Sequence, residues 1–162
     1  MSEAGTSRRW GGSVVAVVVG IVVGAVLSLG VDEVLHVTGV YPPWGRPMSD
    51  GLFVLATAYR LLFSVLGCYV IARLAPSRPM LHALVGGAIG LVLCIVGAVT
   101  TWNTDLGPHW YSVLLAVTAL PCAWIGGRFW TGSLKESVAG RKLAVLLPGA
   151  QSDDGVETTE GE

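Results

Sequence analysis

Four long apolar runs constrain this chain more than any other feature. They cover residues 13–36, 51–74, 80–102 and 109–129, and each is long enough for a helix to cross a bilayer, which takes about 20 residues. Charged residues make up 13% of the chain, against about 25% in soluble domains. Backbone polar groups in hydrocarbon must bond within their own segment, so such runs form helices. The sequence therefore predicts an all-α, four-helix transmembrane bundle over residues 13–130.

A full positive charge, Arg60, lies well inside the second run. An arginine at that depth is costly, and by default it marks a functional site or a structural lock. Asp32 lies near the end of the first run, and a short loop joins the two runs, so the two side chains are expected to pair. Residues at helical spacing around them complete a candidate intramembrane polar cluster. Its members are Ser28, Asp32, His36, Thr57, Arg60 and Ser64.

This polar cluster has three interpretations. The first is that Asp32 and Arg60 lock two helices together. The second is that the cluster forms a polar pocket that binds an anion or relays protons. The third is that Arg60 extends its charged end toward the membrane surface, or pairs with another subunit.

Small residues recur along the first and third runs and form two ridges. Small residues at such spacing let membrane helices approach closely. The first ridge consists of Gly20, Gly24 and Ser28, and it continues into the polar positions Asp32 and His36. The second ridge consists of Gly86, Gly90, Cys94, Gly97 and Thr101. Both ridges predict close helix packing.

The chain carries no pattern typical of catalysis or metal binding. There is no nucleophile paired with a base, no phosphate-binding glycine loop and no basic nucleic-acid face. His36 and Asp32 would need His109, far along the chain, as a third metal ligand. The three cysteines lie singly in apolar runs, as small buried residues do. We therefore expect no catalytic, metal or cofactor site, no enzyme activity and no nucleic-acid partner.

The segments outside the bundle differ in character. Residues 1–12 are predicted to be a polar N-terminal tail, and the run that follows is interpreted as a transmembrane helix. The alternative is a cleaved signal peptide, because small residues at 28–30 resemble a cleavage site. Residues 131–148 predict an amphipathic helix on the membrane surface. The acidic segment 149–162 is expected to be disordered.

The distribution of basic residues predicts the orientation. With both termini on one side, that side holds eight basic residues, and the other side holds Arg46. Loops rich in lysine and arginine remain in the cytoplasm, so both termini are expected to be cytoplasmic. The eight residues are Arg8, Arg9, Arg73, Arg78, Arg128, Lys135, Arg141 and Lys142.

Several segments are distinctive, above all GVYPPWG at 39–45 and ARLAPSRPM at 72–80. With these segments the chain resembles an uncharacterised family of small bacterial four-helix transmembrane proteins. The resemblance implies a location in the bacterial cytoplasmic membrane. It also implies that Asp32, Arg60 and the proline-rich loop are the distinguishing features. The family brings no assigned activity, cofactor or substrate.

The sequence supports three functional hypotheses. The first is a non-enzymatic accessory or assembly subunit that is surrounded by the lipid bilayer and associates with itself or with another membrane protein. It follows from the short loops, the small-residue ridges and the missing catalytic motifs. The alternative is a small oligomeric transporter or channel with an intramembrane site at Arg60 and Asp32. The third is a lipid- or quinone-modifying membrane enzyme.

Overall fold

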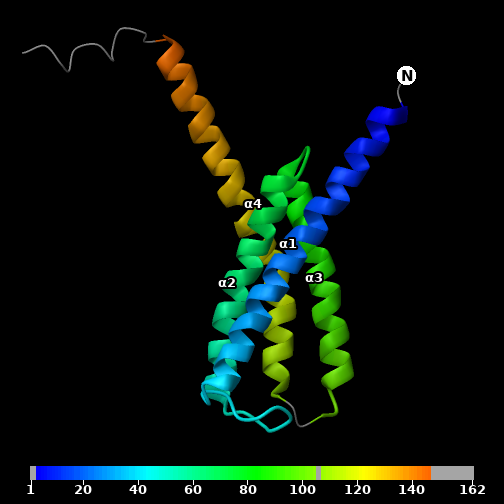
Figure 1. The fold of residues 1–162 in the computed structure, drawn as a ribbon, viewed down its shortest axis with the longest axis vertical. Helices are drawn as coiled ribbons and strands as arrows, with labels where there is room; N and C mark the ends of the chain where they lie inside the picture. The colour runs from blue at the N-terminus through cyan, green and yellow to red at the C-terminus, as the bar shows by residue number, and fades with distance from the viewer. Residues whose placement is uncertain (1–2, 105–106, 147–162) are drawn as a thin grey trace, which may run out of the picture. The chain divides into compact units, whose positions relative to one another are not determined.

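The protein is built from four helices and the short segments between them (Figure 1). The computed structural model describes residues 3–104 and 107–146, with side chains described for 10–104 and 107–141. The helices are α1 (Glu3–Val37), α2 (Asp50–Leu74), α3 (Pro79–Thr101) and α4 (His109–Leu146). The described residues contain no strand. The predicted all-α, four-helix architecture is confirmed.

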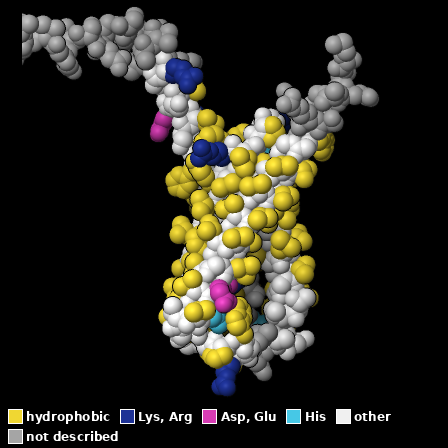
Figure 2. Space-filling model, viewed as in Figure 1, with side chains coloured by type: hydrophobic (Ala, Val, Ile, Leu, Met, Phe, Trp, Pro, Cys, Tyr) yellow, Lys and Arg dark blue, Asp and Glu magenta, His cyan; other side chains and the backbone are white. Residues whose placement is uncertain are grey.

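Each helix contains a stretch that is long and apolar enough to cross a membrane. These stretches are Trp10–Val37, Asp50–Leu74, Pro79–Thr101 and His109–Arg141. Figure 2 shows that hydrophobic side chains cover the bundle over most of its length, as expected where the solvent is lipid. The chain is a multi-pass transmembrane protein.

Two helices are longer than the sequence predicts. Helix α1 begins at Glu3 rather than near residue 13, because a formed helix extends at little cost through residues without proline. Helix α4 continues past residue 129 to Leu146. Gly126 and Gly127 form a pair of the kind that often ends a helix, but they do not close α4. They pack instead against α2 and α3, where a Cβ on Gly126 would lie 2.9 Å from the Cβ of Cys68.

The chain divides into two compact units, Met1–Thr131 and Gly132–Glu162. The first unit holds the bundle. In the second unit, the described residues are helical as far as Leu146. This agrees with a helix after residue 131, although the helix continues directly from the fourth span. The expected disorder of residues 149–162 falls outside the described residues.

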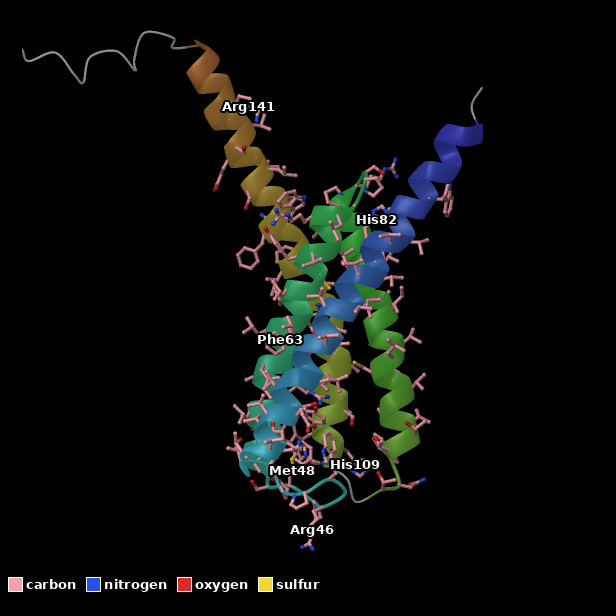
Figure 3. All side chains as sticks on the ribbon, in the orientation of Figure 1. Arg46, Met48, Phe63, His82, His109 and Arg141 are labelled. Carbon is pink, nitrogen blue, oxygen red and sulfur yellow. The ribbon has the colours of Figure 1, made fainter. Side chains whose placement is uncertain are left out.

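The two ends of the bundle differ, and we name them by their connections. The loop end carries the loop at 38–49 together with the adjoining ends of α3 and α4. The turn end carries the short connection between α2 and α3 at 75–78. In Figure 3, Arg46 lies at the loop end and His82 at the turn end.

The helices touch directly in the half of the bundle toward the turn end. A Cβ added to Gly67 of α2 would lie 2.8 Å from the backbone oxygen of Gly20 in α1. Ile71 is 1% exposed and packs against Gly20 and against Gly86 of α3. A small buried cluster completes this contact, consisting of Cys68, Ala72, Ala83 and Ala123. The predicted close packing is present at Gly20, Gly24 and Gly86, but the prediction is wrong for Gly90 and Gly97, where a Cβ would meet nothing within 4 Å.

Candidate functional site

An ion pair joins α1 to α2 near the loop end. The Nη2 of Arg60 donates to the Oδ2 of Asp32 at 2.5 Å. Asp32 is 5% exposed, whereas the Arg60 side chain is 34% exposed. Asp32 lies little more than one turn from the end of α1, whereas Arg60 lies further from the start of α2, and its long side chain reaches the carboxylate. The pairing expected from the sequence is present.

Two tyrosines extend this ion pair into a network. The hydroxyl of Tyr59 donates to Oδ1 of Asp32, so each carboxylate oxygen accepts a hydrogen bond. The hydroxyl oxygen of Tyr41 lies 3.3 Å from that of Tyr59 and 3.4 Å from the backbone oxygen of Leu52. The network thus connects the loop at 38–49 to both helices. It holds the Asp32 carboxylate in place from two sides.

Neither tyrosine belongs to the polar cluster that the sequence predicts. Tyr59 directly precedes Arg60, and that adjacency was the available signal. Tyr41 lies in a proline-rich loop, and its burial depends on how that loop folds back onto α1. Such tertiary placement leaves no periodic signature in the sequence.

Arg60 keeps hydrogen-bond donors that the protein does not use. A guanidinium carries five N–H donors, and the bond to Asp32 takes one of them. The Nε of Arg60 is buried and has no hydrogen-bond partner among the described residues. The Cζ of Arg60 lies 5.9 Å from the ring centroid of Tyr111 in α4. The guanidinium is therefore positioned by three helices while part of its donor capacity stays free.

Arg60 lines a cavity of about 570 Å³ between the four helices. Figure 2 shows the surface hollowed between α1 and α3. Most of the lining is glycine, alanine, leucine and cysteine. The polar side chains in the lining are Ser28, Arg60, Ser64, Thr101, Tyr111, Ser112 and Thr118. Phe63 of α2, labelled in Figure 3, also belongs to the lining.

The cavity exists because α3 leaves the other helices part of the way along its length. Gly86 packs on Ile71, and Gly87 packs on Ala123. One turn later the contact is gone, because a Cβ added to Gly90 would meet nothing within 4 Å. The same holds for Gly97. The cavity therefore lies on the loop-end side of the helix contacts and is closed at the turn end.

The structure gathers some of the predicted polar residues and separates others. Ser28 and Ser64 line the cavity together with Arg60. The hydroxyl of Thr57 instead donates to the backbone oxygen of Phe53 at 2.8 Å, which is a bond within its own helix. Thr57 is not part of the cavity lining.

His36 also lies apart from the cavity, and it anchors the loop at 38–49. Its Nδ1–H donates to the backbone oxygen of Asp32 at 2.7 Å. Its ring stacks on Trp44 with 3.9 Å between centroids and meets the edge of Tyr41 at 5.3 Å. His36 therefore supports the loop that delivers Tyr41 to the polar network.

No group of three or more metal-binding side chains comes together within the part of the chain that the structure describes. The three cysteines are free thiols; Cys68 and Cys122 are buried, and Cys94 is half-buried. His109 donates from Nε2 to the backbone oxygen of Trp102 at 3.0 Å. Chemically, the arrangement offers hydrogen-bond donors at one end of an apolar space.

Comparison with protein-family models, with curated proteins and with solved structures finds no match for this chain.

Proposed function

We propose that this chain is a non-enzymatic accessory protein that holds a membrane-soluble molecule within its bundle. The observation that carries the proposal is the cavity of about 570 Å³. Sites for small molecules have volumes of about 300–1,000 Å³, with mostly apolar walls and a few convergent polar groups. The cavity has this size and composition, with Arg60 as its charged group.

The shape of the cavity favours holding a molecule over conducting one. A conducting path must continue through the bundle to the other side. At the turn end, α1 and α2 meet at Gly20 and Gly67, and α2 and α3 meet at Ile71 and Gly86. These contacts close the space in a single protomer. A transporter or channel would need a second conformation or a path between protomers.

The state of Asp32 favours binding over catalysis. A general base must reach the proton that it removes. Both carboxylate oxygens of Asp32 already accept hydrogen bonds, from Tyr59 and from Arg60. The carboxylate therefore serves to join helices, and this supports a non-enzymatic role over a lipid- or quinone-modifying one.

The proposal is tested by native mass spectrometry after gentle detergent extraction. Wild-type protein is expected to carry a bound molecule, and the Gly90→Leu variant is expected to lose most of it, because the new side chain takes up part of the cavity. Gly30→Leu is the matched control, since a Cβ there also meets nothing within 4 Å but the position lies outside the cavity lining. Bare protomers in all three samples, or the same adduct in all three, would contradict the proposal.

The proposed location is the bacterial cytoplasmic membrane, with both termini cytoplasmic. Arg46 lies at the loop end, whereas Arg73, Arg78 and Arg128 lie toward the turn end. This asymmetry favours a cytoplasmic turn end.

A reporter enzyme that is active only in the periplasm tests this orientation. Fusion after Trp44 is expected to give activity, and fusion after Ser77 is expected to give none. Matched fusions to a reporter that is active only in the cytoplasm should give the reverse. Activity in the periplasm after Ser77 would show that the orientation is wrong.

A further inference from the structure

The geometry points to one class of occupant for the cavity: an uncharged molecule with a carbonyl-bearing ring on a single apolar chain, as in a membrane quinone. This inference rests on the proposed function and names the ligand of the same site. The carbonyl oxygen accepts from Arg60, the ring lies among aromatic side chains, and the chain follows the apolar lining.

The head group is inferred from the charges and donors at Arg60. Arg60 lines the cavity, and the guanidinium N–H groups that Asp32 does not take favour an oxygen acceptor there; the buried Nε is not among the groups that a ligand reaches. Asp32 already neutralises Arg60 at 2.5 Å, so an anionic head would meet a carboxylate beside its arginine. Arg60 lies ten residues after Asp50, roughly 15 Å along the helix axis, where a phosphate is costly. An uncharged carbonyl oxygen accepts from these donors without repulsion from Asp32 and without the burial of a charge.

The ring is inferred from the aromatic groups in the lining. Tyr111 lies beside the guanidinium, with 5.9 Å from its ring centroid to Cζ of Arg60. Phe63 of α2 also belongs to the lining, and its ring centroid lies 6.1 Å from that of Tyr59. Aromatic side chains pack well against planar rings. A flat head group bound to Arg60 would therefore find ring partners on two helices.

The single chain is inferred from the length and width of the cavity. Along α3 the lining runs from Gly86 to Thr101, which is roughly 22 Å at about 1.5 Å per residue. Leu93, Gly90 and Gly97 make this wall apolar. A membrane-spanning helix about 30 Å long and 10 Å wide fills roughly 2,400 Å³, several times the cavity volume of about 570 Å³. A single apolar chain fits where a partner helix does not.

Three probes with the same ten-carbon chain test the head group on the full chain in lipid nanodiscs. They are decylubiquinone, decylbenzene and decyl phosphate, and equilibrium dialysis measures the amount bound. Nanodiscs without protein supply the background of lipid partition, and Gly90→Leu tests whether the probes bind in the cavity. Decylubiquinone is expected to bind saturably. Decylbenzene is expected to bind at least about tenfold more weakly, because it lacks the charge-assisted hydrogen bond. Decyl phosphate is also expected to bind at least about tenfold more weakly, because its charge is costly at that depth.

The double variant Asp32→Leu/Arg60→Leu removes the donors without leaving a lone charge. It is expected to bind decylubiquinone and decylbenzene equally. If this variant fails to fold, the three probes on wild-type protein still decide the question. Equal binding of decylbenzene, or tighter binding of decyl phosphate, overturns the inferred head group. If Gly90→Leu then still abolishes probe binding, the proposed binding function stands. A protein partner lost in Gly90→Leu would overturn the inferred ligand class instead.

Discussion

Arg60→Leu and Asp32→Leu are each expected to destabilise the protein strongly when made alone. Each leaves the opposite charge without its partner in a setting of low dielectric constant. In soluble proteins, breaking a buried pair in this way costs on the order of 3–5 kcal/mol. The cost is expected at the lower end of that range or below it, because the Arg60 side chain is 34% exposed. Thermal unfolding in detergent measures the loss.

The double variant Asp32→Leu/Arg60→Leu is expected to recover most of this loss, because no charge remains unpaired. Glu33→Leu is the matched control: it removes the same charge from an exposed neighbouring position, and its effect should be small. Losses that simply add in the double variant would show that the two side chains do not stabilise each other.

Gly67→Leu is expected to have the second large effect, by forcing α1 away from α2. Its Cβ would lie 2.8 Å from the backbone oxygen of Gly20, and a backbone atom cannot turn aside as a flexible side chain can. Overpacking costs about 1–3 kcal/mol in ordinary cores, and this variant should reach or exceed that range. The measurement is the midpoint of thermal unfolding in detergent.

Gly90→Leu is the control for Gly67→Leu, since it makes the same change in a helix with open space around the Cβ. It should leave stability unchanged or raise it by up to about 1 kcal/mol, because glycine is a poor helix former. Equal destabilisation by both variants would show that helix contact at Gly67 is not the cause.

The sequence predicts the bundle and its central ion pair for a physical reason. In a membrane, apolar length fixes each helix and its depth. Asp32 lies roughly one turn from the loop end and Arg60 roughly three turns from it, and the long arginine side chain can cover the difference. The face of α3 that carries Gly86, Gly90 and Gly97 is equally evident from spacing. Whether that face touches another helix is not evident, because the tilt of α3 depends on the packing of Ile71.

Other features depend on choices that local sequence leaves open. A glycine pair in a helix serves either to end it or to admit a neighbouring helix. Gly126 and Gly127 pack against α2 and α3, and α4 continues through them. A helical threonine either faces a site or bonds its own backbone. Thr57 does the latter, which spacing alone does not reveal.

The partial attachment of α3 has a mechanical consequence. The helix is clamped at Gly86 and Gly87, and the part that follows acts as a lever with its fulcrum at those residues. From Gly86 to Thr101 the arm is roughly 22 Å long. A rotation of about 5° about the fulcrum displaces Thr101 by roughly 2 Å. A rotation of this size would change the width of the cavity at its loop end, and it would carry the start of α4 along, because Nε2 of His109 bonds the backbone oxygen of Trp102.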